Sequence, residues 1–177
     1  MPDSVTLWQS HLENGRKRNH GEWMPANGSE PAHLKAVPYT LPAKTDQKQR
    51  TIYTLSMPVS SGDHPPVVLQ PETKIRVRGK IASSHRIWFG MTLRRENGDF
   101  AGRFQTILPA EEFKSGEPFE VVLNLSDYHL DPSLAQWAES LPKAPYDLIV
   151  QNVWCHTLWD PAGLQVSEIE LMIPTEE

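Results

Sequence analysis

From residue 51 onward, apolar residues recur at every second position of this chain. In TKIRVRGKIA (73–82), isoleucine and valine alternate with lysine and arginine, and IWFGMTLR (87–94) again has an apolar residue at every second place. A period of two indicates β-strands, because successive side chains of a strand point to opposite faces of the sheet. This part of the chain is therefore expected to form strands rather than helices.

Turn residues divide this part of the chain into short segments. The expected strands are 51–57, 67–69, 73–83, 86–95, 100–108, 119–125, 146–157 and 164–173. Asn97-Gly98 predicts a hairpin, because this pair tolerates the positive φ of tight turns. One short helix is expected at 132–141, with Asp131 as its N-cap and a proline at its first position. A slip in the alternation at Ser167-Glu168 predicts a β-bulge.

The number and spacing of these strands predict the fold class. Short strands joined by hairpin turns, with one short helix, are typical of an all-β, two-sheet antiparallel β-sandwich of the jelly-roll kind. The residues expected to face its core are Ile75, Val77, Ile81, Ile87, Phe89, Met91, Leu93, Phe104, Val121, Leu123, Val150, Val166 and Leu171. Alternating inward residues of two sheets interdigitate in such a core.

The first 48 residues show no comparable alternation. Residues 5–12 fit a short amphipathic helix capped by Ser4, but several glycines and prolines follow closely. Apolar residues such as Trp23 and Leu34 indicate that this segment lies against the sandwich, since disordered segments are poorer in them. We therefore predict an irregular N-terminal arm at 1–48 packed on a β-sandwich domain at 49–177, which would fold without the arm.

Charge is distributed unevenly along the chain, whose net charge is −5. Residues 1–71 sum to +1, residues 72–105 carry eight Lys or Arg against three Asp or Glu, and residues 106–177 carry two against thirteen. The basic centre predicts a local face that attracts anions. The acidic whole is repelled by nucleic acid and anionic membranes, so general nucleic-acid binding is not expected.

Several classes of protein are excluded by what the sequence lacks. No apolar run approaches the roughly 18–20 residues of a transmembrane helix, so no membrane span is expected. The first residues lack the layout of a signal peptide, and we expect a soluble chain, secreted or periplasmic if it belongs to a larger protein. The single cysteine, Cys155, has no basic neighbour in the sequence and is expected to be a buried, inert thiol.

No cofactor is expected from the spacing of the titratable residues. The seven histidines show neither His-x-His nor His-x-x-x-His spacing, which argues against a metal centre of the cupin or zincin kind. A structural calcium ion is the metal that loops containing Asp could hold. No nucleophile elbow or phosphate-binding glycine loop is present.

The order of the strands resembles that of jelly-roll domains of the galactose-binding-like class, which includes many carbohydrate-binding modules. The resemblance covers about 51–173 and rests on the segments at 73–82, 87–93 and 119–125 and on the final strand GLQVSEIELM (163–172). In that final strand, Leu164, Val166, Ile169 and Leu171 occupy the apolar places of the class. The resemblance implies a domain that binds a polysaccharide, as an accessory part of a larger protein.

The outward side chains of the middle strands suggest such a binding site. Trp88 is outward beside Gly90, which would leave its ring free to stack on a sugar. The candidate ligand-binding residues are Trp88, Arg76, Arg78, Arg103, Gln105, Asn124 and, in a loop, Trp159. The arginines favour an acidic or sulfated glycan. Trp154, within a strand, is expected in the core.

Three functions stay open at this level. The first is a non-catalytic module that binds a glycan. The second is a structural or assembly sandwich that binds a protein partner, with Trp88 covered by the arm and Trp159 closing one end of the sandwich. The third is a catalytic jelly roll acting on polysaccharide, since carboxylates distant in sequence can meet in a fold.

Overall fold

The structure is a computed structural model that describes residues 4–10, 12, 19–43, 48–59 and 65–175. The strands are β1 (Ser4–Gln9), β2 (Glu22–Met24), β3 (His33–Lys35), β4 (Val37–Leu41), β5 (Arg50–Pro58), β6 (Lys74–Lys80), β7 (Ile87–Arg94), β8 (Phe100–Leu108), β9 (Pro118–Asn124), β10 (His129–Leu130), β11 (Ile149–Thr157) and β12 (Gln165–Pro174). The short 3-10 helices are η1 (Ala110–Glu112), η2 (Leu125–Asp127), η3 (Pro132–Ser140) and η4 (Asp160–Ala162). None of the helices in these ranges is long and apolar enough to cross a membrane.

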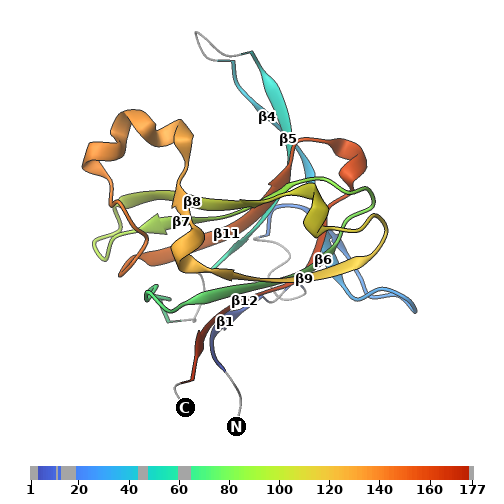
Figure 1. The fold of residues 1–177 in the computed structure, drawn as a ribbon, viewed down its shortest axis with the longest axis horizontal. Coiled ribbons are helices and arrows are strands. Elements are labelled where there is room, and N and C mark those ends of the chain that lie inside the picture. Colours follow the sequence, from blue (N-terminus) through green and yellow to red (C-terminus); the bar gives the residue numbers. More distant parts are fainter. Residues whose placement is uncertain (1–3, 11, 13–18, 44–47, 60–64, 176–177) are drawn as a thin grey trace.

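The strands form two antiparallel sheets of six strands each. Sheet A has the order β2-β3-β12-β6-β9, with β1 also paired to β12, and sheet B has the order β10-β8-β7-β11-β5-β4. Figure 1 shows the two sheets as layers, with η3 and the β4–β5 hairpin extending from sheet B on the side away from sheet A. The predicted two-sheet antiparallel sandwich is confirmed.

The core between the sheets follows the predicted alternation. In β6 the residues alternate between buried and half-buried, and Ile75 and Val77 are at most 2% exposed. All the predicted core residues are buried except Val121, which is half-buried. Val121 lies in β9, the strand at the end of sheet A, where the core is covered from one side only.

Three local predictions are confirmed. Gly98 has a φ of 94° in the hairpin between β7 and β8, where the Arg95 N–H donates to the Asp99 carbonyl at 2.8 Å. The β12 strand shifts register against β6 between Val166 and Glu168, as expected for a bulge. The helix begins at Pro132, and the Asp131 carboxylate accepts a hydrogen bond from the Ser133 N–H at 2.9 Å.

The N-terminal segment is not irregular in the structure. It supplies β1, β2 and β3 to sheet A and β4 to sheet B, and its Trp8, Leu12 and Leu34 are part of the core. Of the residues predicted to form a helix, 5–9 belong to β1, because β12 offers them backbone partners, and residue 11 lies outside the described residues. Tertiary pairing here overrides a weak local preference. The boundary predicted at residue 48 therefore lies between two paired strands, β4 and β5.

The segment 67–69 is also not a regular strand. Its contribution to sheet B is a single bridge between Val68 and Ile149, outside the named strands. Val67 and Leu69 are nevertheless buried, so the alternation correctly identified their inward side. The sequence pattern reports which side chains are buried, whereas a strand also needs a continuous row of backbone partners.

Candidate functional site

The structure does not bring the predicted site residues together. Arg76 and Arg78 of β6 and Asn124 of β9 point out of sheet A, where Lys74 pairs with Asn124. Trp88 of β7 and the Arg103 and Gln105 of β8 belong to sheet B. Because the inner faces of the two sheets pack together, the outward residues of one sheet lie on the opposite side of the molecule from those of the other (Figure 1). A single site combining Trp88 with Arg76, Arg78 and Asn124 is therefore not formed.

The outward residues of sheet A form an ionic face. It consists of Arg76, Arg78, Glu120, Glu168 and Glu170. The Arg76 guanidinium contacts Glu170 and lies 3.3 Å from Glu168, while Arg78 lies 3.3 Å from Glu168. Next to this face, Lys80 Nζ lies 3.0 Å from Glu30 Oε1. The basic strand β6 thus lies between the acidic residues of β9 and β12, which offset its positive charge.

Arg76 holds a buried carboxylate. Glu170 is 4% exposed and also accepts a hydrogen bond from Thr6 Oγ1 of β1. Breaking a buried ion pair by removing one partner leaves an uncompensated charge, which costs more than an exposed pair contributes. Arg76 is accordingly a structural residue that joins β6 and β12.

We expect Arg76→Met to lower the free energy of unfolding by about 3 kcal/mol, because the Glu170 carboxylate loses its cation in a desolvated position. Urea unfolding at neutral pH measures this loss. Arg78→Met is the matched control, since the Arg78 side chain is 42% exposed, and it is expected to cost less than about 1 kcal/mol. Equal effects of the two substitutions would contradict the role assigned to Arg76.

The outward residues of the central strands of sheet B form an aromatic platform, which consists of Trp88, Trp154 and His156. In the register of β11 and β7, His156 lies opposite Trp88, and Trp154 lies opposite Gly90. The ring centroids of Trp88 and His156 are 5.1 Å apart at an interplanar angle of 13°, and those of Trp154 and His156 are 5.3 Å apart at 15°. The three rings are therefore close to parallel, and each indole is stacked on the imidazole of His156.

Two expectations about these residues are corrected by this arrangement. The space beside Gly90 is not vacant, because a Cβ at Gly90 would lie 2.1 Å from the Trp154 ring. Trp154 is half-buried on the outer face rather than in the core, since its neighbours Val153 and Cys155 take the inward phase of β11. A strand that is apolar on both phases does not by itself reveal which phase faces inward.

The three rings of the platform carry no charge at neutral pH. Burial lowers the pKa of His156 from 6.5 to about 4, so its imidazole is uncharged at neutral pH. The Arg86 guanidinium lies over the Trp88 ring, 4.9 Å from its centroid, in a cation–π contact. Two polar atoms of β11, Trp154 Nε1 and Asn152 Oδ1, are buried and have no hydrogen-bond partner within the described ranges.

The remaining predicted residues lie around the platform. Trp159, just beyond the end of β11, is 44% exposed, and its ring stacks on His85 with centroids 5.9 Å apart at 23°. Gln105 lies beside Gly90 on one side and His129 on the other. Arg103 bonds Asp131 at 3.3 Å and Ser133 at 3.2 Å, so it fixes the start of η3.

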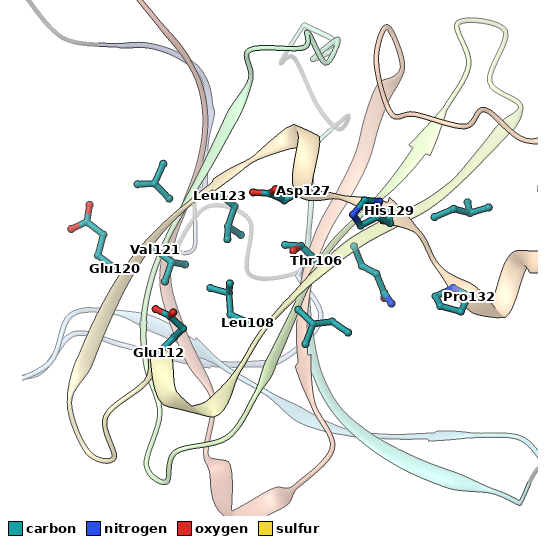
Figure 2. Close-up of a pocket in the computed structure, with 13 residues that line it drawn as sticks. Thr106, Leu108, Glu112, Glu120, Val121, Leu123, Asp127, His129 and Pro132 are labelled. Carbon is teal, nitrogen blue, oxygen red and sulfur yellow. The ribbon is translucent and has the colours of Figure 1, made fainter.

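A cleft of about 750 Å³ lies where the edges of the two sheets face each other. We call it the edge cleft. Figure 2 shows Val121 and Leu123 of β9 together with Leu108 of β8 at its centre, and Glu112, Asp127 and His129 around it. Sequence reasoning missed this cleft, because it depends on which strands end the two sheets.

The structure offers neither a metal centre nor a reactive thiol among the described residues. Within the part of the chain that the structure describes, no three His, Cys, Asp or Glu side chains gather as ligands of a metal ion. Cys155 is 1% exposed, and burial raises the pKa of its thiol well above the usual range. A thiol in that state is a poor nucleophile.

The two-sheet sandwich defines a jelly-roll domain, and its fold is similar to that of carbohydrate-binding modules. The family 11 module of the cellulosomal cellulase Lic26A-Cel5E of Clostridium thermocellum aligns over 100% of this chain and 91% of its own, with a TM-score of 0.52 and 12% identity. A family 11 module from Clostridium thermocellum in complex with a β-1,3-1,4-mixed-linked tetrasaccharide aligns over 98% and 89%, with a TM-score of 0.50 and 12% identity. At this identity the likeness shows the fold alone.

Comparisons of sequence give no family. No family model matches the chain, and no curated protein matches it. The catalytic domain of a laminarinase from Thermotoga petrophila RKU-1 aligns with a TM-score of 0.36 and 11% identity, over 99% of this chain and 100% of its own. A TM-score of that size does not establish a shared fold. The likeness to the two family 11 modules confirms the predicted resemblance at the level of the jelly-roll fold.

Proposed function

We propose that this chain is a non-catalytic carbohydrate-binding module and that its aromatic platform binds a neutral polysaccharide. The observation that carries the proposal is the stack of three nearly parallel aromatic rings on the outer face of the central strands. The C–H face of a sugar packs on aromatic rings, while neighbouring polar groups bond its hydroxyls. The shared fold with family 11 modules supports the same reading.

The charges around the platform favour a neutral rather than an acidic glycan. The expectation of an acidic ligand rested on the basic segment 72–105, but its Arg76 and Arg78 lie on the opposite face and are paired with glutamates. His156 is uncharged at neutral pH, and Arg86 is engaged with the Trp88 ring. Hydrogen bonds and ring contacts, rather than ion pairs, would therefore hold the sugar.

The composition of the strands that carry and flank the platform supports binding without catalysis. β5, β7, β8 and β11, all of whose residues the structure describes, contain no Asp or Glu. Glycoside hydrolysis in most families requires a pair of carboxyl groups flanking the scissile bond. The strands beneath a sugar bound on the platform would not supply that pair.

Specific roles follow for the residues around the platform. Trp88 and Trp154 would pack against sugar rings, His156 would hold the two indoles by stacking on both, and Trp159 with His85 would extend the contact beyond the ends of β7 and β11. Gln105, which is half-buried beside Gly90, would bond hydroxyls. Arg103 would act indirectly, by fixing η3 beside the platform.

We expect Trp154→Ala to weaken binding of a β-1,3-1,4-linked glucan tetrasaccharide by about 30-fold, because a central aromatic contact contributes about 2 kcal/mol. Isothermal titration measures the affinity, and thermal melts verify the fold. Val122→Ala is the control, since Val122 is 50% exposed on the opposite sheet and should leave affinity unchanged.

Three results would contradict the proposal. They are a tetrasaccharide affinity that Trp154→Ala does not change, a preference for a sulfated polysaccharide that disappears at high salt, and release of reducing ends from the glucan. The first would remove the platform from the site. The second would restore an acidic ligand, and the third would restore the catalytic alternative.

A further inference from the structure

The edge cleft lies between two strands whose outer edges are unpaired. β9 ends sheet A and pairs with β6 on one side. In sheet B, β10 pairs with Phe104 and Gln105 of β8, so residues 106–108 have no strand partner on that side among the described residues. Unpaired N–H and C=O groups along a strand edge form a template for another strand. Proteins usually protect such an edge with charges, prolines or a covering segment.

The edge cleft is apolar inside and exposes two large apolar residues at its rim. Leu108, Val121 and Leu123 lie at its centre (Figure 2). Ile107 is 46% exposed and Val122 is 50% exposed, and both line the cleft. An exposed apolar rim around an open strand edge is characteristic of a surface that binds a partner.

The charged residues around the cleft are all acidic. Glu112, Glu120 and Asp127 line it, and no Lys or Arg does so within the described part of the chain. Glu120 is paired with arginines of the ionic face, whereas Glu112 and Asp127 are exposed and form no ion pair with a described residue. In Figure 2, Glu112 lies toward one end of the apolar residues and Asp127 toward the other.

We propose that the edge cleft binds an extended peptide that is apolar at alternate positions and carries Lys or Arg at both ends. The peptide adds as a strand to the free edge of β9, with its apolar side chains against Leu108, Val121 and Leu123. β9 has seven residues, so a peptide of similar length, about 23 Å, matches it. Its basic ends lie near Glu112 and Asp127, whose charges are complementary to theirs.

The same charges argue against a second copy of this chain as the occupant. Two copies meeting edge to edge at β9 would bring Glu112, Asp127 and their counterparts together, and each copy has a net charge of −5. Like charges across an interface oppose association. The proposed partner is therefore a different, basic segment. This gives a physical basis to the protein partner named among the sequence-based alternatives. The edge cleft adjoins the aromatic platform, because Ile107 of its lining pairs with Trp88, but the peptide adds to β9 of the other sheet.

The test uses two labelled heptapeptides, Lys-Val-Thr-Val-Thr-Val-Lys and its acidic counterpart Glu-Val-Thr-Val-Thr-Val-Glu, with the full chain. We expect fluorescence anisotropy to show the basic peptide binding about tenfold or more tightly than the acidic one. Glu112→Lys/Asp127→Lys should reverse this preference, and its melting temperature verifies the fold. Slowed hydrogen exchange of the β9 amides in the complex locates the added strand.

Controls separate this proposal from glycan binding. Trp154→Ala should bind the basic peptide with unchanged affinity, and the β-1,3-1,4-linked glucan tetrasaccharide should leave the β9 amide resonances unshifted. Equal binding of both peptides, an unaltered preference in the charge-reversed variant, or unprotected β9 amides in the complex would overturn the proposal. Shifts of β9 caused by the tetrasaccharide, or a dimer that the peptide does not dissociate, would assign the cleft to another occupant.

Discussion

A chain lacking residues 1–44 is expected not to form the cooperative sandwich. The deletion removes β1 and β3, which pair with β12, and β4, which pairs with β5. It also removes Trp8, Leu12 and Leu34 from the core, each of which contributes about 2–3 kcal/mol by burial. Their sum is comparable with the whole stability of a domain, about 5–15 kcal/mol. Two strand edges would also become exposed.

Circular dichroism and amide dispersion in NMR spectra of the truncated chain measure this outcome directly. Two substitutions in the full chain provide a matched pair on the removed segment. Leu34→Ala, at a residue 1% exposed, is expected to cost about 3 kcal/mol, and Tyr39→Ala, at a residue 51% exposed, close to nothing. A cooperative melt of the truncated chain would support the independent domain predicted from residue 49 onward.

Acid is expected to destabilise the protein through His156. The pKa of this imidazole is about 4 in the folded protein, against 6.5 for an unperturbed histidine, because burial disfavours the charged form. As pH falls below 6.5, the unfolded chain takes up a proton that the folded chain does not, so stability decreases until pH reaches about 4. A shift of about 2.5 pH units corresponds to about 3 kcal/mol lost across that window.

The experiment compares His156→Gln with the unaltered protein. Urea titrations give the free energy of unfolding of each protein at pH 7 and at pH 4.5. The loss between these two pH values should be about 2–3 kcal/mol smaller in the variant, because the variant lacks the titrating ring. His129→Gln is the control, since His129 is exposed, and it should keep the pH dependence of the unaltered protein. An identical pH dependence in His156→Gln would show that His156 is solvated or charged in the folded state.

Features set by local chain geometry were predictable from the sequence. The period of two was correct for all the predicted core residues except Val121, because it reports the side of a strand on which each residue lies. The Asn-Gly turn and the Asp131 cap were correct for the same kind of reason, since each depends on contacts within a few residues. The jelly-roll resemblance followed from the order of these local elements.

The tertiary structure alone decided how these elements combine into sites. Alternation marks Arg76 and Trp88 equally as outward, yet they lie on opposite sides of the sandwich, because β6 joins sheet A and β7 joins sheet B. Alternation also does not show that Trp88 stacks on His156 or that Arg76 pairs with Glu170, because these partners are far apart in the sequence. Short N-terminal strands, whose pattern is weak in isolation, are likewise specified by the backbone of β12 and β5. Which strands pair, and which edges stay open to form the edge cleft, depends on contacts between distant segments, and such contacts leave no periodic signal in either segment alone.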